Sequence, residues 1–266
     1  MISVIIPTYK PQTYLWECLD SVCNQTLSKD NFEVILVLNG CKEPYNSQIQ
    51  DYISKHQDVI WNYIQTDIGG VSNARNIAMV AATGDYATFI DDDDYISPSY
   101  LDEMLSLADK DTMVFAKPIA FWDDTREYKS YVITEEYQRC APKGRQKASN
   151  VRKFFSGPCM KLIPKSYIQG RFFDVRFKNG EDSLFMFLIS DRFKDVVFTS
   201  DKSVYYRRVR ENSSTTTHRS KLQVIRDCIA PMKVITKIYF SAPARYSFKF
   251  YISRMLGGFH TMLKGS

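Results

Sequence analysis

The sequence lacks the features that mark several large classes of protein. No two of its six cysteines form a CxxC pair, which argues against a zinc ribbon and a dense disulfide framework. No apolar run reaches the ~20 residues that a membrane-spanning helix needs. The first apolar run begins at Met1 without a charged region or a cleavage site before it, so we expect no signal peptide. These absences favour a globular protein in a reducing cytoplasm.

Acidic residues are scarce at one end of the chain. The formal net charge is +5, yet residues 221–266 carry eight Lys or Arg and a single acid, Asp227. That segment therefore holds +7 of the charge, which leaves residues 1–220 at −2. The two parts of the chain are electrostatically different.

The pattern up to Asp94 is typical of an α/β fold. Short apolar runs alternate with amphipathic stretches, which predicts βα units and a largely parallel sheet. The third helix is expected after Gly69-Gly70, with Ser72 or Asn73 as its N-cap. The expected strands cover residues 3–6, 32–38, 59–64 and 86–90, and the expected helices cover residues 14–22, 45–55 and 74–82.

The rest of the chain is less regular. Pro98 is expected in the first turn of a helix, and residues 122–150 predict a pair of strands followed by a loop. Residues 221–266 predict helices broken at Pro231 and Pro243, so we expect one domain over residues 1–220 and a helical, basic extension after it. Further strands are expected over residues 112–116, 196–199 and 203–206, and a further helix over residues 182–190.

Four consecutive carboxylates, Asp91 to Asp94, follow the strand expected over residues 86–90. Acidic runs more often mark a solvated surface, but solvated runs rarely follow a buried strand, and ligands of open α/β sheets gather at the carboxyl ends of strands. Such a cluster repels itself unless a cation joins it. Mg²⁺ takes carboxylate oxygens together with the phosphates of a bound substrate. This acidic run therefore points to metal-assisted handling of a nucleotide diphosphate.

Four motifs resemble those of family 2 glycosyltransferases with a GT-A fold. The resemblance covers roughly residues 2–217 and implies a Rossmann-like, mixed but mostly parallel sheet flanked by helices, with a nucleotide-binding half over residues 1–94 and an acceptor half over residues 95–220. It also implies inverting transfer of a sugar from a nucleotide diphosphate donor to an acceptor hydroxyl. In family order and spacing, the motifs are Ser3-Val-Ile-Ile-Pro-Thr-Tyr9, Gly70-Val-Ser-Asn-Ala-Arg-Asn76, Gly84 to Asp94, and Asn179-Gly-Glu-Asp-Ser-Leu-Phe185.

The first and third acids of the run, Asp91 and Asp93, match the DxD motif of the family. The resemblance makes Asp93 the direct ligand of Mn²⁺ or Mg²⁺, which would neutralise charge on the departing diphosphate. Asp91 would hold the ribose or a metal-bound water at the same metal site. Asp92 and Asp94 would support the donor site, or they end the strand and cap the next helix.

Pro7-Thr8-Tyr9 follows the first strand, where the nucleotide base would lie. The Tyr9 ring offers a stacking face with little rotamer entropy to lose, although a tyrosine there can also pack into the core. Asn39 stands where the family usually has an aspartate, and its amide can accept or donate a hydrogen bond. The resemblance favours a UDP-sugar donor, but Asn39 guarantees uridine less than a carboxylate would.

Asp67 and Arg75 flank the Gly-Gly turn. Arg75 could set its guanidinium against a donor phosphate or against the acidic run. The alternative is a structural ion pair that fastens the helix to the sheet. The sequence favours neither interpretation, and one role does not exclude the other.

Glu181-Asp182 matches the acidic pair that starts a helix in the family, and the resemblance makes Asp182 the general base. A base must reach the acceptor hydroxyl as it attacks the anomeric carbon. Carboxylates also occur at helix N-termini for structural reasons alone. The matching residues around the pair, Lys161 among them, favour catalysis, with Glu181 and Lys161 as support on the acceptor side.

Arg208 and Arg210 occupy the two basic positions of the last family motif. Members with His at the second position can use it as a metal ligand, whereas Arg210 can only clamp the diphosphate. The resemblance therefore implies a metal shell with few protein ligands. Residues 213–217 are expected to form a loop that closes over the donor and excludes water.

Residues 221–266 predict basic amphipathic helices of the kind that lie on anionic membrane surfaces. The alternatives are that they pack back on the domain or form a homo-oligomer. Nucleic-acid binding is disfavoured, because the aromatic residues are not set in a recognised module. We therefore expect a peripheral location at the inner membrane face.

The leading hypothesis is a metal-dependent inverting glycosyltransferase that extends a surface polysaccharide or a lipid-linked glycan. A sugar nucleotidylyltransferase is one rival, but it should carry a Gly-rich, basic loop after the first strand, and Pro7-Thr-Tyr-Lys-Pro11 is not such a loop. A catalytically inactive nucleotide- or glycan-binding module is the other rival. The presence of both the acidic run and Glu181-Asp182 argues against it.

Overall fold

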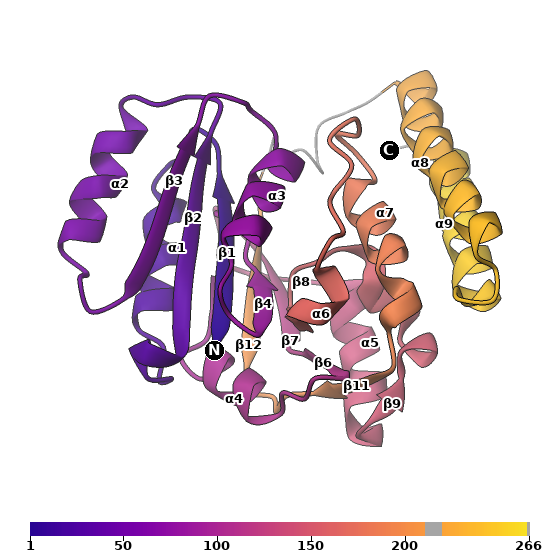
Figure 1. Cartoon of the computed structure of the whole chain (residues 1–266), viewed down its shortest axis with the longest axis horizontal. Coiled ribbons are helices and arrows are strands. Elements are labelled where there is room, and N and C mark those ends of the chain that lie inside the picture. The colour runs from indigo at the N-terminus through magenta and orange to yellow at the C-terminus, as the bar shows by residue number, and fades with distance from the viewer. Residues whose placement is uncertain (211–219, 265–266) are drawn as a thin grey trace.

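Two sheets lie side by side in the molecule (Figure 1). The computed structural model describes residues 1–210 and 220–264. An eight-stranded sheet has the strand order β3-β2-β1-β4-β10-β6-β11-β9, and a four-stranded sheet has the order β5-β12-β7-β8. Helices flank the large sheet, as the sequence predicts for an α/β fold.

One half of the large sheet is parallel. β1 (Ile2–Thr8) lies between β2 (Phe32–Asn39) and β4 (Tyr86–Phe89), and β3 (Ile60–Thr66) pairs with the outer side of β2. Every residue of β1 and β2 is buried, which accounts for their continuous apolar sequences. The chain builds outward from β1 to β3 and then returns to β4 on the other side of β1. A topological switch point, where ligands bind in open α/β sheets, therefore lies between β1 and β4.

The other half of the large sheet is mixed. β10 (Lys161–Pro164) runs antiparallel to β4 and to β6, so it joins the two halves. β11 runs parallel to β6, and the short β9 runs antiparallel to β11. Their bounds are Thr112–Phe115 for β6, Gln146–Lys147 for β9 and Asp195–Phe198 for β11.

The small sheet brings the acidic run next to the arginine-rich strand. β5 (Tyr95–Ile96) follows the run directly and pairs antiparallel with β12 (Val204–Val209). β12 runs parallel to β7 (Lys117–Trp122), whose other neighbour is β8 (Tyr128–Lys129). Two motifs that are far apart in the sequence therefore meet in space.

Helices cover both faces of the parallel half (Figure 1). α1 (Tyr14–Cys23) and α3 (Val71–Ala81) lie on opposite faces, as right-handed crossovers require when the strand order reverses. The other helices before residue 210 are α2 (Tyr45–Ser54), α4 (Tyr100–Ser106), α5 (Val132–Cys140), α6 (Lys165–Ile168) and α7 (Glu181–Leu188), with short 3₁₀ turns at Lys29–Asn31, Ala141–Lys143, Ala148–Asn150, Arg152–Ser156 and Ser190–Arg192.

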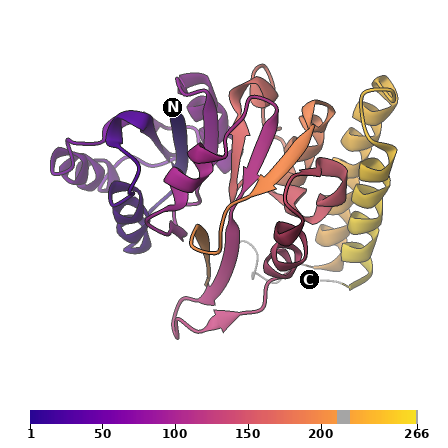
Figure 2. The same cartoon turned by 90° about the horizontal axis from the view of Figure 1, so that it is seen from below.

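α8 (Lys221–Ser241) and α9 (Phe248–Lys264) lie side by side at the end of the molecule opposite α2 (Figure 2). The linker between them packs into the domain through Tyr246, whose ring stacks on Phe187 at a centroid distance of 5.3 Å. Phe250 of α9 adds a second aromatic contact to α7. Within the two described ranges, no helix is both long enough and apolar enough to cross a membrane.

The structure corrects four local predictions. α3 begins at Val71 with Gly70 as its N-cap, not at Ser72 or Asn73. Pro98 precedes α4 instead of lying in its first turn. β8 pairs with β7, but β7 ends at Trp122, so the expected strand pair begins before residues 122–150, and the loop prediction is wrong for residues 132–140, which form α5. Pro231 lies inside α8, where its ring packs over the backbone of residue 180, and only the break at Pro243 is confirmed.

Candidate active site

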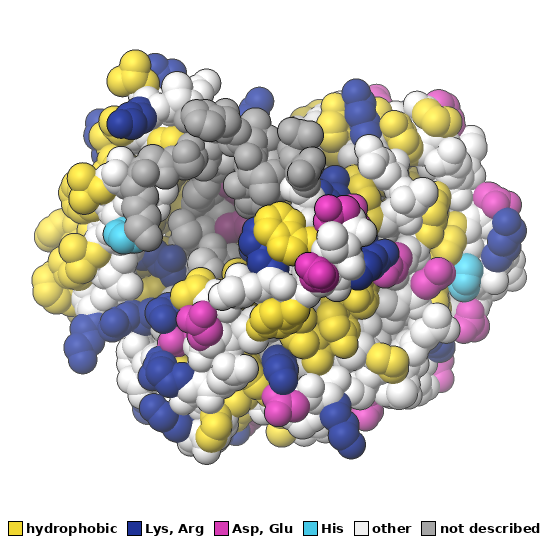
Figure 3. Space-filling model, turned by 180° about the vertical axis from the view of Figure 1, so that it is seen from behind, with side chains coloured by type: hydrophobic (Ala, Val, Ile, Leu, Met, Phe, Trp, Pro, Cys, Tyr) yellow, Lys and Arg dark blue, Asp and Glu magenta, His cyan; other side chains and the backbone are white. Residues whose placement is uncertain are grey.

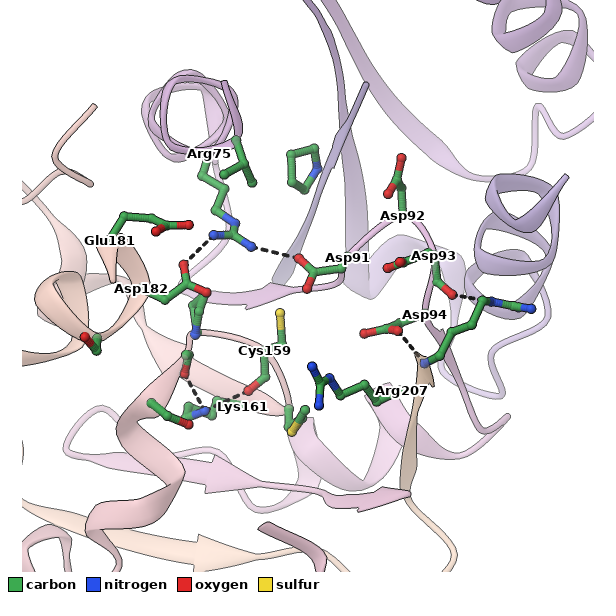
Figure 4. A pocket seen from close by; sticks show the side chains of 18 of the residues that line it. Arg75, Asp91, Asp92, Asp93, Asp94, Cys159, Lys161, Glu181, Asp182 and Arg207 are labelled. Atoms are coloured by element: carbon green, nitrogen blue, oxygen red, sulfur yellow. Dashed lines mark hydrogen bonds and ion pairs between the residues drawn. The ribbon is translucent and has the colours of Figure 1, made fainter. Parts of the chain in front are cut away.

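A pocket of about 640 Å³ opens at the carboxyl ends of the parallel strands (Figure 4). One wall comes from the ends of β1 and β2, from α3 and from the acidic run. The opposite wall comes from residues 131–133, residues 154–161 and the first turn of α7, while β12 contributes residues 207 and 208, and residue 210 follows directly after this strand. The pocket therefore lies where the switch point predicts a ligand site.

Arg75 of α3 joins two of the predicted acidic sites across this pocket. Its Nη1 donates to Asp182 Oδ1 at 2.6 Å, and its Nη2 donates to Asp91 Oδ1 at 2.8 Å. The Arg75 side chain is only 3% exposed, and its guanidinium lies over the Phe173 ring. A buried guanidinium that binds two carboxylates holds them at a fixed spacing. Of the two roles considered for Arg75, the structure therefore has the ion pair with the acidic run.

Asp92 and Asp93 have partners on the donor side. Asp92 Oδ2 accepts a hydrogen bond from Thr8 Oγ1 at 2.5 Å. Asp93 Oδ2 accepts from Nε of Arg210 at 3.0 Å and from its Nη2 at 2.6 Å. The Arg210 guanidinium also lies over the Tyr14 ring, 4.4 Å from its centroid. Arg210 therefore contacts the acidic run directly.

Asp94 and Arg208 are built into the fold. The backbone N–H of Arg208 donates to Asp94 Oδ1 at 2.8 Å. The buried Arg208 guanidinium donates to the backbone carbonyl of Asp93 and to the carboxylates of Glu17 and Asp123. The charge of Arg208 is thus neutralised inside the protein.

The acidic run carries more negative charge than its partners neutralise. Burial raises the pKa of Asp92 to about 7 and also raises the pKa of Asp93 and of Asp94. Repulsion between neighbouring carboxylates adds to the effect of burial, while Thr8 and Arg210 oppose it only in part. A cation at the run would offset this excess.

Glu181-Asp182 forms the first turn of α7, and α8 packs behind this turn. The N-cap, Gly180, has a φ of 80°, in the left-handed region that favours glycine. A Cβ at this position would lie 3.1 Å from Pro231 Cγ. Asn179 Nδ2 donates to Asp227 Oδ2 of α8 at 3.0 Å. The helical extension therefore supports the turn that carries the acidic pair.

The two acids of this pair differ in their partners. Burial raises the pKa of Asp182, and the Arg75 guanidinium opposes that shift. Glu181 has no such ion pair with any described residue, and burial together with the charge of Asp182 raises its pKa to about 7. Asp182 is therefore the acid of the pair whose ionised form an arginine directly favours.

Lys161 fixes the floor of the pocket. Its buried Nζ donates to the carbonyl oxygens of Gly157 and Cys159, each at 2.7 Å. Burial lowers the Lys161 pKa to about 7. These bonds set the backbone of residues 157–159, and a Cβ on Gly157 would lie 3.5 Å from Asp182 Oδ2. Lys161 thus shapes the surface beside Asp182.

The predicted base-binding residues lie together at the ends of β1 and β2. Pro7 and Tyr9 line the pocket, and Tyr9 is 53% exposed. Asn39 is buried, and its amide already has two partners: Nδ2 donates to the Thr8 carbonyl at 2.7 Å, and Oδ1 accepts from the Gly70 N–H at 2.8 Å. Asn39 therefore ties β1 to the turn before α3.

Two predicted donor-binding residues, Thr8 and Asp67, are not among the described residues that line the pocket. Asp67 is exposed, and its Oδ1 accepts a hydrogen bond from Gln65 Nε2 at 2.8 Å. The loop predicted to close over the donor, residues 213–217, lies outside the described residues.

Two further residues, Arg207 and Tyr131, line the pocket although no motif in the sequence indicates them. Arg207 extends from β12 into the pocket, across from Asp182 (Figure 4), and its guanidinium lies 5.0 Å from the centroid of the Tyr131 ring. The alternation of side chains along a strand groups Arg208 with Arg210 and sets Arg207 apart. The one sequence signal for Arg207 is that it is a third basic residue in this strand and points to the opposite side from Arg208.

Carboxylate oxygens are the candidate metal ligands in the pocket. In residues 1–210 and 220–264, no group of three or more His, Cys, Asp or Glu is arranged to hold a metal. Asp91 and Asp93 each bind an arginine through a single oxygen. The protein thus offers two carboxylates with an oxygen left for a cation.

Comparison with known proteins places these motifs in a family. The family model described as glycosyl transferase family 2 matches residues 3–172. The minor teichoic acid biosynthesis protein GgaB of Bacillus subtilis is 28% identical over 226 residues, which cover 82% of this chain and 24% of GgaB. The putative glycosyltransferase EpsH of the same species is 27% identical over 231 residues, which cover 83% of this chain and 64% of EpsH. The chain thus spans less than two thirds of either relative.

A solved structure shares the fold. Residues 1–349 of TarS from S. aureus, in complex with UDP-GlcNAc, align with a TM-score of 0.67 and 20% identity over 98% of this chain and 81% of that chain. At this identity, the likeness is one of fold. It confirms the predicted α/β architecture.

Proposed function

The chain belongs to glycosyl transferase family 2, and from that premise we propose that it transfers a sugar from a nucleotide diphosphate to a hydroxyl of a glycan or a lipid-linked glycan. The GT-A fold predicted from the sequence agrees with this membership. The observation that carries the proposal is the Arg75 bridge, which places Asp91 of the acidic run and Asp182 on one guanidinium in one pocket. A donor-binding acid and a candidate base that meet in this way are what sugar transfer needs.

In the proposed reaction, Asp182 takes the proton of the acceptor hydroxyl. Arg75 binds Asp182 through Oδ1, so Oδ2 is available to the acceptor. The acceptor oxygen forms a bond to the anomeric carbon as the bond from that carbon to the diphosphate breaks on the opposite face, and this inverts the configuration. Arg75 orients Asp182 and favours its ionised form, and Glu181 supports the acceptor beside it.

The acidic run fits a divalent cation, Mn²⁺ or Mg²⁺. Asp93 is the proposed direct ligand and Asp91 its neighbour at the site, since each has a carboxylate oxygen outside its arginine contact. Two protein carboxylates suffice for such a cation when donor phosphates and water complete the shell. A bound cation would neutralise charge that builds on the departing diphosphate. Arg210, already in contact with Asp93, would then clamp the diphosphate.

A UDP-sugar is the proposed donor. The exposed Tyr9 ring beside Pro7 offers a stacking surface for a base, and the TarS structure of the same fold holds UDP-GlcNAc. The proposed acceptor is a precursor of a cell-surface polymer. The name of the relative GgaB, a teichoic acid biosynthesis protein, supports that class of acceptor.

A panel of nucleotide sugars tests the proposal. UDP-, GDP-, ADP- and dTDP-sugars are added to the purified chain with Mg²⁺ or Mn²⁺, and thermal stabilisation selects the donor. Release of the nucleoside diphosphate is then followed with candidate acceptors. We expect a UDP-sugar to give the largest stabilisation and to be consumed only with an acceptor. Formation of pyrophosphate from a nucleoside triphosphate and a sugar phosphate would identify a nucleotidylyltransferase, and donor binding without any transfer would identify an inactive module.

We also propose that α8 and α9 rest on an anionic membrane surface. Phe248, Leu256, Phe259 and Leu263 fall on one side of α9 by helical spacing and are 60, 63, 54 and 86% exposed. Exposed lysines of α8 lie nearby, and no acid follows Asp227. Hydrophobic and basic side chains share this edge of the molecule, at the left of Figure 3. Exposed apolar and basic side chains of this kind bind the surface of anionic bilayers.

Vesicle binding tests this surface. We expect the chain to sediment with vesicles that contain phosphatidylglycerol and not with neutral vesicles, and we expect Leu256→Asp with Phe259→Asp to abolish binding. Val80→Asp is the matched control, because Val80 is also an exposed apolar helix residue but lies on α3. If the double variant instead converts a dimer into a monomer without changing vesicle binding, α9 is an interface between copies of the chain.

A further inference from the structure

The four arginines that line the pocket differ in their partners. Arg75 and Arg208 each bind two carboxylates, and Arg210 binds Asp93. Among the described residues, the Arg207 guanidinium has no ion pair and no hydrogen bond. The guanidinium instead lies over the face of the Tyr131 ring, as a cation–π contact. Arg207 is therefore a pocket cation that protein carboxylates do not occupy.

Tyr131 adds a second donor at the same place. The side chain lines the pocket just before α5, and its hydroxyl has no hydrogen-bond partner within residues 1–210 and 220–264. Burial raises the Tyr131 pKa to about 12, so the hydroxyl stays protonated at neutral pH. A guanidinium fork and a phenol O–H are thus both available next to each other.

The two donors belong to the acceptor side of the pocket. In Figure 4, Arg207 faces Asp182 across the cavity, and Cys159 lies between them. Tyr131 comes from the segment that forms the wall opposite the nucleotide-binding strands. A group bound by Arg207 would therefore lie near the attacking hydroxyl and away from Tyr9, where the base is proposed to stack.

We propose that Arg207 and Tyr131 form a subsite for a phosphate group that the acceptor carries close to the hydroxyl that attacks. This acceptor subsite, as we call the two residues, rests on the proposed function. The guanidinium fork can donate to two oxygens in parallel, and the Tyr131 hydroxyl can donate to a third. A phosphate group has oxygens for all three donors, whereas a carboxylate has only the two that the fork occupies. The site therefore suits a phosphorylated acceptor better than a carboxylated or a neutral one.

The acidic run is the main competitor for Arg207. Asp91 and Asp94 both act on the Arg207 charge through space. Each of these carboxylates already has a closer partner, since Asp91 binds the Arg75 guanidinium and Asp94 accepts the backbone N–H of Arg208. A counter-charge role for Arg207 predicts that its loss weakens the donor site, whereas the acceptor subsite predicts that the donor site is unchanged.

Phosphate binding to the UDP-loaded chain separates these roles. Inorganic phosphate is titrated calorimetrically into protein saturated with UDP and Mg²⁺, so that the donor diphosphate position is already filled. We expect Arg207→Gln to weaken phosphate binding about tenfold to a hundredfold, and Arg207→Lys and Tyr131→Phe to weaken it less. Arg226→Gln, on the exposed face of α8, is the matched control and should change nothing. UDP affinity should stay within about threefold in all variants.

Four results would overturn the subsite. Phosphate that displaces UDP binds at the donor position, and phosphate that binds wild type and Arg207→Gln equally is adventitious. Loss of UDP affinity in Arg207→Gln makes Arg207 a counter-charge of the acidic run. The absence of phosphate binding to the UDP-loaded wild type also rejects the subsite. If UDP itself fails to bind the wild type, the proposed function fails first, so the two failures are distinguishable.

Kinetics provide a second readout once the donor is known. With matched acceptors that differ only in one phosphate, Arg207→Gln should raise the KM of the phosphorylated acceptor about tenfold or more. It should leave the KM of the neutral acceptor and of the donor unchanged. An equal loss with both acceptors would contradict the assignment.

Discussion

The two walls of the pocket are built differently. On the donor wall, polar side chains already have partners: Thr8 binds Asp92, and Arg75 binds Asp91. On the acceptor wall, the acceptor subsite holds donors that no described side chain accepts from. A wall whose groups satisfy one another is organised before a ligand arrives, whereas the other wall is completed by its ligand. The donor wall should therefore tolerate few substitutions, and the acceptor wall should set the choice of substrate.

Asp182 lies where the two walls meet, and its loss should have the largest effect. Asp182→Asn removes the proposed base but keeps the shape of the side chain, so kcat should fall about 10³-fold, in the range for general base catalysis. UDP affinity should stay within about threefold, because the nucleotide binds at the other end of the pocket. Steady-state rates and calorimetry measure the two quantities. Asp124→Asn, an exposed control, should be fully active, and full activity in Asp182→Asn would remove the base assignment.

Arg75 holds the donor wall to the base, and its replacement should come second. In Arg75→Lys, a single ammonium cannot bind both Asp91 and Asp182 through a fork, so kcat should fall about 10²-fold. The unfolding free energy should fall by about 3 kcal/mol, since the buried cation would keep only one of its two carboxylate partners. Urea unfolding measures this loss. The exposed pair of Arg176 and Asp174 supplies the control, for which Arg176→Lys should change stability by less than about 1 kcal/mol.

Metal removal should have a smaller effect that is confined to the donor wall. We expect EDTA to weaken UDP binding about tenfold in the wild type. The Asp93→Asn variant should bind UDP as weakly in the presence of Mg²⁺ as the wild type does in EDTA. Adding EDTA to this variant should therefore cause no further loss of UDP affinity. Calorimetry with and without Mg²⁺ measures the four affinities. An Asp93→Asn variant that still responds to Mg²⁺ as the wild type does would place the metal elsewhere.

Glu33 stabilises the sheet beneath the donor wall, and its replacement should affect stability and leave activity unchanged. Burial favours the protonated form, but hydrogen bonds from Ser3, Thr83 and Gly84 outweigh that effect and lower the Glu33 pKa. A lowered pKa stabilises the folded state above the unfolded value, and this contribution is lost as the pH falls through the folded value.

Glu33→Gln should therefore lower the unfolding free energy by about 1–2 kcal/mol at pH 7. The difference from wild type should shrink as the pH drops below about 4. Urea unfolding at the two pH values measures both. Glu127→Gln, at an exposed position, should show neither effect. A difference that stays constant with pH would mean that the charge of Glu33 is not what matters.

The parallel half could be predicted because local pattern and environment agree there. β1 and β2 are buried on both sides, so their sequences are continuously apolar. α5 could not be predicted in this way, because its buried face includes Thr134 and Glu136. Thr134 Oγ1 donates to the Pro118 carbonyl at 2.7 Å, and Glu136 pairs with Arg139. Such partners make polar residues acceptable inside the protein, and a single sequence does not show those that come from distant segments.

Dependence on distant segments also explains which residues of the site could be predicted and which could not. Asp93, Asp182 and Arg75 lie in sequence motifs with characteristic residue types, so they could be identified before their geometry was known. The position of Arg207 depends on Tyr131, which precedes a helix that the sequence does not reveal. The site residues that motifs identify still await the experiments above.

Because α8 supports the turn that carries Glu181-Asp182, truncated or chimaeric forms of this chain should have an altered active site. Pro231 fills the space over Gly180, and Asp227 holds Asn179, so a chain ended at residue 220 would lose the backing of its own active-site turn. A chimaera that carries the C-terminal helices of a relative would replace that backing as well. Such an exchange should alter the turnover rate along with the location of the protein, so residues 221–264 do not form a transferable module.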